Sequence, residues 1–188
     1  VMVVGSRLGG GATTVDADLS ATVDNRTLRS SYVIIDITNP DVAPKVLLEF
    51  SHPNLGFTTS IPAPIVMGTD NEGNGNWYLL LGSGADTSAA GFEDVKSTQN
   101  ARLFLLNLKS VAAGTSPLEP SFGTAGIMTL SDSNSFISDM TAVDYGLDNY
   151  TTDAIYFGTV SGTTSAWGGK VYRMTIQTAT GAAQSTIG

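Results

Sequence analysis

The sequence predicts an all-β fold assembled from repeated units of four short antiparallel strands. Three observations lead to this prediction: the apolar runs are short, turn-forming residues interrupt them often, and the runs recur in the same order along the chain. The chain has 188 residues, with 21 Gly, 7 Pro, 41% hydrophobic residues and 14% charged residues. Helical periodicity is not sustained anywhere, and the nearest candidate, 96–113, is centred on the strand-like run LFLLNL.

Four elements define the repeat. An apolar run that ends in Gly and a hydroxyl residue occurs three times, and a second apolar run follows each copy. A third element precedes two of the glycine runs, and a fourth follows the second apolar run. Copies of the first element are VMVVGS (1–6), YLLLGS (78–83) and AIYFGT (154–159), and copies of the second are YVIIDI (32–37), LFLLNL (103–108) and VYRMTI (171–176). Copies of the third are SIPAPIVMG (60–68) and SDMTAVDYG (138–146). Copies of the fourth are KVLLEF (45–50) and GIMTL (126–130), and its third copy is expected in the last few residues.

Each unit is therefore predicted to contain four strands, a to d, that cannot bury their faces alone. Stacking of such units is typical of a β-propeller, with a blade remnant at 1–58 and blades at 59–136 and 137–188. These make about two and three-quarter blades, whereas a propeller closes with at least about four, so we expect a part of a larger propeller. A β-sandwich is the alternative for short, evenly spaced strands, and the shared order of four elements favours the propeller.

Composition excludes several classes of function. Nine Lys and Arg against 17 Asp and Glu give a net charge of −8, which repels nucleic-acid backbones and anionic lipids. The chain has no Cys, so it cannot form a disulfide framework or a thiolate metal site. No apolar run approaches the length of about 18 residues needed for a membrane span. Val1 lies inside an apolar run, and we expect the chain to be cut from a longer protein.

The connections between strands b and c are the predicted binding loops, because they vary while the strands stay constant. They span 7–30, 84–101 and 160–170. Enzymatic activity is not expected: His52 is the only histidine, and no nucleophile elbow or phosphate loop occurs. Trp77 is expected to pack between blades, and Trp167 is expected to lie at a turn.

Several stretches together resemble one family. RSSYVIIDITNPDVAPKVLLEF (29–50) and LGFTTSIPAPIV (55–66) resemble the C-terminal propeller domain of the PilY1/PilC proteins, which are associated with the tip of bacterial type IV pili. The family's characteristic text there is "YVVLDVTDP", "P-LLWEF" and "LGYTWSRP", and Thr59 and Ile61 replace its Trp and Arg. Further stretches resemble the family in the same order: WYLLLGSG (77–84), ARLFLLNL (101–108) and TAVDYGLDNYTTDAIYFGT (141–159).

The resemblance implies a modified propeller of about seven blades at the cell surface or pilus tip, on the outer membrane or outside the cell. It implies a non-enzymatic binding and assembly module that acts in pilus biogenesis, control of retraction and surface attachment. The implied partners are minor pilins or the pilus-tip complex, and a host or abiotic surface. The alternative is a quinoprotein-like propeller enzyme, or a general propeller scaffold such as an outer-membrane assembly factor.

The resemblance also implies calcium binding in the loop between strands a and b of the last unit. Its pattern, D-x-D-x-D-G-x-x-D, places the ligands at Asp144, Asp148 and Asp153. Gly146 stands where the second carboxylate is expected, Asn149 replaces the Gly, and one residue is inserted before Asp153. Ordinary turn chemistry explains the same residues. Two other acidic groups have weaker patterns: Asp70, Glu72 and Asn74; and Asp16, Asp18 and Asp24 with Asn25.

Overall fold

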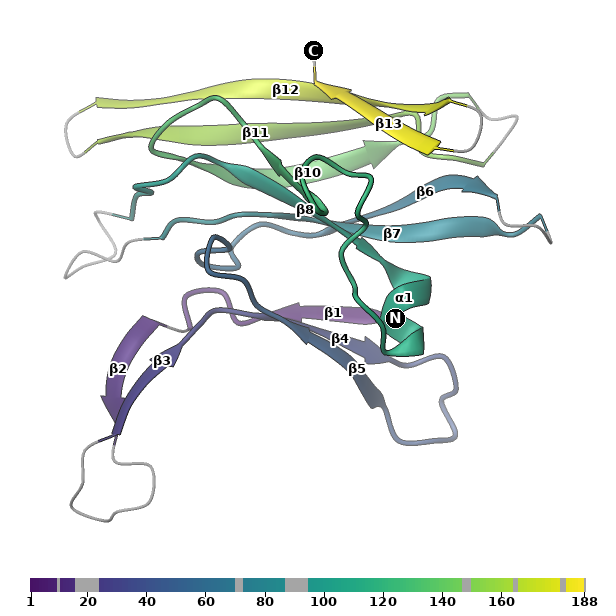
Figure 1. The fold of residues 1–188 in the computed structure, drawn as a ribbon, viewed down its shortest axis with the longest axis horizontal. Helices are drawn as coiled ribbons and strands as arrows, with labels where there is room; N and C mark the ends of the chain where they lie inside the picture. Colours follow the sequence, from purple (N-terminus) through teal and green to yellow (C-terminus); the bar gives the residue numbers. More distant parts are fainter. Residues whose placement is uncertain are drawn as a thin grey trace.

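The strands form three antiparallel sheets of three or four strands that are stacked in chain order, with a separate hairpin beside them (Figure 1). The computed structural model describes residues 1–9, 11–15, 24–69, 73–86, 95–146, 150–163, 166–179 and 182–187. The all-β prediction is confirmed. No helix in these ranges is long and apolar enough to cross a membrane.

The first sheet has the order β1-β4-β5 and consists of β1 (Met2–Gly5), β4 (Tyr32–Asp36) and β5 (Lys45–Phe50). The strands expected at 1–6, 32–37 and 45–50 are thereby confirmed. The connection 7–30 was expected to be a loop, but it contains the hairpin of β2 (Gly11–Val15) and β3 (Asp24–Leu28). In Figure 1 this hairpin extends away from the three sheets.

The second sheet runs in chain order, β6-β7-β8-β9. Its strands are β6 (Ala63–Thr69), β7 (Gly75–Gly82), β8 (Arg102–Asn107) and β9 (Ile127–Thr129). Every neighbouring pair is antiparallel, as expected for an a-b-c-d unit.

A short helix, α1 (Leu108–Ala113), follows β8 and was missed by the sequence analysis. The Asn107 side chain accepts hydrogen bonds from the amide groups of Lys109 and Ser110, which satisfies two free N–H groups at the first turn. Gly114 ends the helix in the left-handed conformation, at φ 67°. Its buried Val111 joins the core between the first and second sheets.

The third sheet has the order β10-β11-β12-β13. It contains β10 (Ser135–Val143), β11 (Ala154–Thr163), β12 (Ala166–Ala179) and β13 (Ala182–Ile187). The fourth strand expected in the last residues is confirmed as β13. The connection expected at 160–170 is instead a continuation of two strands, which stay paired as far as Thr163 and Ala166. Trp167 consequently lies in a strand rather than at a turn.

The second sheet is buried on both faces because alternate side chains of a strand point to opposite sides. Leu80 of β7 joins the core shared with the third sheet, while its neighbours Leu79 and Leu81 join the core shared with the first. β8 alternates in the same way, with Leu103 and Leu105 on one side and Phe104 and Leu106 on the other. An uninterrupted apolar run such as LFLL is the sequence consequence of this two-sided burial.

Side chains at equivalent strand positions point in the same direction in all three sheets, which in the second and third sheets is toward the preceding sheet. On β12, Tyr172 and Met174 pack toward the second sheet, and the matching positions on β8, Phe104 and Leu106, pack toward the first. The matching positions on β4 are Val33 and Ile35, which point away from the core that holds Tyr32 and Ile34. This outer face of the first sheet is largely apolar: it carries Met2, Val4, Val33, Ile35 and Val46, together with the charged Glu49, which is paired with Val33.

The repeated glycine has a steric reason at Gly82. A Cβ atom there would lie 2.6 Å from the Cβ of Ile137, the residue by which the third sheet approaches the second. The Ile137 amide donates to the Ser83 carbonyl oxygen at 2.7 Å beside this contact. Only glycine allows the two sheets to approach this closely.

Candidate functional site

The ends of two strand a–b hairpins from neighbouring sheets lie beside each other. The β6–β7 hairpin belongs to the second sheet, and the β10–β11 connection belongs to the third. Two hydrogen bonds join them: the Thr152 amide donates to the Val66 carbonyl oxygen at 2.9 Å, and the Val66 amide donates to the Thr152 hydroxyl at 3.1 Å. Thr152 is buried, so this paired contact holds the two hairpins in a fixed relation.

Asp153 organises the β10–β11 connection from within. Its Oδ2 atom accepts hydrogen bonds from the amide groups of Tyr145 and Gly146, both at 2.8 Å. Hydrogen bonds to a carboxylate are stronger than bonds between neutral groups, so this side chain fixes the start of the connection to its end. The Asp153 backbone extends the ladder, since its amide donates to Val143 and its carbonyl accepts from Ile176, both at 3.0 Å.

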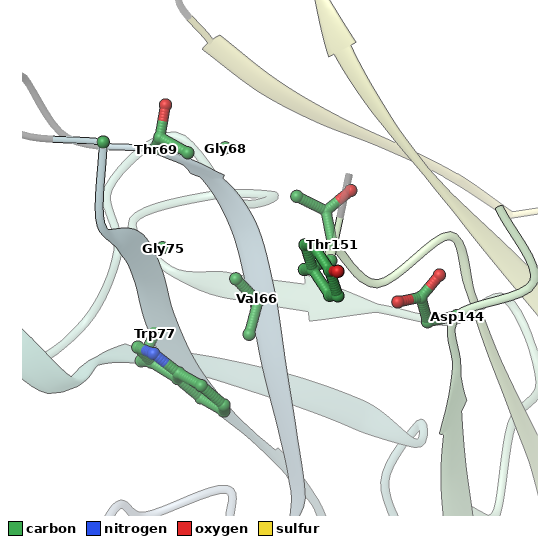
Figure 2. Close-up of a pocket in the computed structure, with 9 residues that line it drawn as sticks. Val66, Gly68, Thr69, Gly75, Trp77, Asp144 and Thr151 are labelled. Atoms are coloured by element: carbon green, nitrogen blue, oxygen red, sulfur yellow. The ribbon is translucent and has the colours of Figure 1, made fainter. Parts of the chain in front are cut away.

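A groove of about 430 Å³ lies between the two hairpins. Figure 2 shows Trp77 on one side of Val66, and Thr151 and Asp144 on the other. The described residues that line it are Val66, Gly68, Thr69, Gly73, Gly75, Trp77, Asp144, Tyr150 and Thr151.

Both aromatic side chains of the groove are exposed. The prediction that Trp77 packs between blades is wrong, because 55% of its surface is accessible. Trp77 precedes the fully buried part of β7, which begins at Leu79. Tyr150 is 83% exposed and has a φ of 53°, a left-handed conformation that turns the chain sharply before Thr151.

Among the described residues, three glycines line the hairpin side of the groove and place no side chains there. Gly68 and Gly73 have φ values of 61° and 83°, and a Cβ at either position would meet nothing within 4 Å. Gly75 is closer, since a Cβ there would lie 2.7 Å from Val66 Cγ1. Side chains at Gly68 and Gly73 would cover the backbone, and one at Gly75 would displace Val66, so the glycines leave the hairpin backbone uncovered on this side of the groove.

The predicted calcium ligands are only partly brought together. Asp144 lines the groove and is exposed, Asp153 is half-buried, and Asp148 lies outside the described residues. The Oδ2 atom of Asp153 is already engaged by two amide groups, so this oxygen does not fit the role of a calcium ligand. Within the described ranges, no group of three or more His, Cys, Asp or Glu side chains is placed to hold a metal ion. Calcium binding stays a prediction that depends on Asp148.

The two weaker acidic groups are also only partly described. Asp70 and Glu72 lie outside the described residues, and so do Asp16 and Asp18. Asn74 lies directly before Gly75 at the start of β7, and Asp24 and Asn25 are the first residues of β3.

His52 has a packing role. Its ring lies 5.2 Å from the ring of buried Phe104, and its Nδ1 atom accepts a hydrogen bond from the Asn54 amide at 3.1 Å. Burial, followed by the positive charges of Arg102 and Arg29, lowers the pKa of His52. The ring is therefore neutral near pH 7 and tied into a turn.

A polar cluster on the third sheet was missed by the sequence analysis. Lys170 donates to Oδ1 of Asp132 and the Tyr172 hydroxyl donates to Oδ2. These bonds, that from Lys170 first, lower the pKa of Asp132. Tyr172 also stacks on Phe157 with ring centroids 5.3 Å apart, so the cluster anchors Asp132 against the sheet. Asp132 and Lys170 are far apart in the sequence, and no local pattern marks the contact.

Comparison of the chain with protein-family models, with curated proteins and with solved structures gave no match.

Proposed function

We propose that the chain is part of a β-propeller of a type IV pilus tip-associated protein of the PilY1/PilC kind. In this proposal it is a non-enzymatic binding and assembly module at the cell surface. The partners are minor pilins or the pilus-tip complex, and the surface to which the cell attaches. The ordered set of strand motifs between Tyr32 and Ile176 supports the family assignment.

One observation carries the propeller proposal: each sheet packs on the preceding one with the same face. The second sheet does so through Phe104 and Leu106, and the third through Tyr172 and Met174. On the first sheet the matching face is largely apolar but exposed, with Val4 accessible over 45% of its surface and Glu49 as its charged residue. An exposed apolar sheet face is costly in water, and a preceding unit of the same kind would cover it.

The connections between strands b and c are the proposed contact points with partners. The arm formed by β2 and β3 is held at its base: the Arg7 amide donates to the Thr58 hydroxyl at 2.7 Å, and the Thr58 amide donates to the Arg7 carbonyl oxygen at 3.0 Å. The second connection is closed by Asp86, whose carboxylate accepts from the amide and the hydroxyl of Thr98 at 2.7 and 2.6 Å. A fixed base with a long arm is suited to presenting a binding loop.

A charge on the outer face of the first sheet tests the propeller. In the full-length protein, Val4→Lys should lower the melting temperature by several degrees, because the charge would be buried against the preceding unit. The matched control is Val42→Lys, because Val42 is 60% exposed in the turn between β4 and β5 and lies on neither face of a sheet. Equal melting temperatures for the two variants would show that nothing covers the face and would overturn the propeller proposal.

Removal of the arm tests the pilus function. In the bacterium that produces this protein, replacing residues 10–29 with a short Gly-Ser linker should reduce surface attachment or piliation while the protein remains folded. Electron microscopy of pili, twitching motility and attachment assays are the measurements. A variant with normal pili, motility and attachment would contradict the arm's role, and unchanged behaviour after loss of the whole protein would contradict the family assignment.

A further inference from the structure

The groove between the β6–β7 hairpin and the β10–β11 connection exposes two aromatic rings that take no part in the cores. Trp77 and Tyr150 both line it, and 55% and 83% of their surfaces are accessible. The ring contacts of the described residues, Phe50–Phe104, His52–Phe104 and Phe157–Tyr172, include neither of them. Large exposed rings contribute little to stability, so their position at one groove points to a ligand that stacks on them.

Polar groups surround these rings on both sides. Asp144 contributes a carboxylate, and Figure 2 shows it with Thr151 on the side of Val66 opposite to Trp77. On the hairpin side the groove is lined by Gly68 and Gly73, where open space around each Cα leaves the peptide groups accessible. Flat apolar rings next to hydrogen-bond acceptors and donors match a pyranose, which has an apolar C–H face and a rim of hydroxyl groups.

The charge of the groove selects against anions. Among its described lining residues Asp144 is the only charged side chain, and the whole chain has a net charge of −8. A sialylated or sulfated sugar would be repelled, whereas the hydroxyls of a neutral sugar can donate to the Asp144 carboxylate. We propose that this groove binds neutral sugar rings of a glycan, which stack on Trp77 and Tyr150 and donate hydrogen bonds to Asp144.

The groove is large enough for a ligand bigger than a single small cation. Its volume of about 430 Å³ lies within the range of about 300–1,000 Å³ that is typical of small-ligand sites. An ammonium ion binds best when aromatic faces converge on one point, and the Trp77 and Tyr150 rings make no contact with each other among the described ring pairs. Separate platforms suit successive rings of an oligosaccharide. This inference concerns the a–b hairpins and does not depend on the pilus proposal.

The first experiment identifies a glycan. The full-length protein is applied to an array of neutral and sialylated glycans, and one bound neutral oligosaccharide is taken forward to isothermal titration. Trp77→Ala should raise its Kd by about tenfold or more, since most of the stacking surface is lost. Trp167→Ala is the matched control, because Trp167 is exposed to a similar degree, 49%, but lies outside the groove.

Two further variants separate stacking from hydrogen bonding. Tyr150→Ala should weaken binding, while Tyr145→Ala, which removes an exposed ring from the same connection, should not. Asp144→Asn should weaken binding by a smaller factor, because the amide keeps one acceptor oxygen. Circular dichroism verifies that each variant is folded, and Trp77→Phe, which keeps a smaller ring, should give an intermediate Kd.

The outcomes decide the proposal. Binding of a neutral glycan that Trp77→Ala weakens and Trp167→Ala leaves within about twofold supports it. Absence of binding to every neutral glycan, or equal affinities for the Trp77 and Trp167 variants, overturns it. Saturable binding of tetramethylammonium chloride without binding of any sugar would also overturn it, and would identify the groove as a cation site.

Discussion

Val66 and Thr152 form a reciprocal pair of hydrogen bonds across two sheets. The Thr152 amide donates to the Val66 carbonyl oxygen at 2.9 Å, and the Val66 amide donates to the Thr152 hydroxyl at 3.1 Å. One side chain and one peptide group thus complete the hydrogen bonding of β6 where it meets the third sheet. The same contact holds the two walls of the groove at a constant separation.

Thr152→Val should destabilise the fold. The substitution keeps the shape and β-branching but leaves the Val66 amide without its acceptor, which costs about 1–3 kcal/mol in a buried setting. Chemical denaturation followed by circular dichroism measures the change. Thr141→Val, at an exposed position on β10, should change stability by no more than about 0.5 kcal/mol. A Thr152 variant as stable as the Thr141 variant would show that the contact contributes nothing.

Asp153→Ala should destabilise the third sheet more than Asp153→Asn does. The alanine removes both bonds to Tyr145 and Gly146, for a loss of about 1.5–3 kcal/mol, whereas asparagine keeps one acceptor oxygen for the two amide groups. Urea unfolding of both variants at pH 7 gives the comparison. Equal losses of unfolding free energy for the two variants would contradict the role of the Asp153 carboxylate in holding the start of the β10–β11 connection to its end.

Calcium should bind in the β10–β11 connection only if Asp148 contributes. Isothermal titration of calcium into the full-length protein is expected to show saturable binding, and Asp148→Ala should weaken it by about tenfold or more because a charged ligand is lost. Asp144→Ala should also weaken it. Asp41→Ala, at an exposed turn after β4, is the control and should leave the heats unchanged. Identical heats for the Asp148 variant and the unmodified protein would exclude this site.

Leu80→Ala and Leu81→Ala should be similarly destabilising although the two side chains point in opposite directions. Both are fully buried, one in each core, and truncation of a buried leucine costs about 2–5 kcal/mol. Val42→Ala, at a position that is 60% exposed in the turn between β4 and β5, should have little effect. A neutral result at either leucine would contradict two-sided burial of β7, as measured by equilibrium denaturation.

Acid should lower the folding stability of the protein, partly through protonation of Asp132. Hydrogen bonds from Lys170 and then Tyr172 lower the pKa of this carboxyl in the folded state. Its contribution is therefore present above the unfolded pKa of about 3.9 and is lost as the pH falls through the lower folded value. Asp132→Asn should reduce the difference in melting temperature between pH 6 and pH 3, while Tyr172→Phe, which keeps the ion pair, should reduce it less. Parallel pH profiles for all three proteins would contradict this role.

The strands were predictable because their signal is local. Runs such as KVLLEF at 45–50 have enough apolar and β-branched residues to define a strand, and β5 matches that run. The β2–β3 hairpin was missed because its segment lacks a continuous apolar run and is rich in Gly, Thr and Asp. The helix α1 was missed for a different reason: it is short and depends on Asn107 and Gly114 as caps rather than on periodicity.

The site was less predictable than the strands. Asp144 was selected from its loop pattern, but the groove beside it depends on Trp77, which belongs to another sheet. The pairing of these two hairpins follows from how the sheets stack, and no sequence spacing encodes it. Alternation along β7 does not explain the exposure of Trp77, because Trp77 shares a face with the buried Leu79 and Leu81; it is exposed because it lies before the buried part of the strand begins.

The two-sided burial of β7 and β8 has a consequence for how the molecule comes apart. Detaching the first or the third sheet uncovers one face of the second, whereas disrupting the second uncovers apolar surface on both neighbours at once. In such a nearest-neighbour system, loss of the second sheet opens both cores together, whereas loss of the first or the third sheet opens only one of them. Leu80 and Leu81 thus couple the stability of two cores that share no side chain.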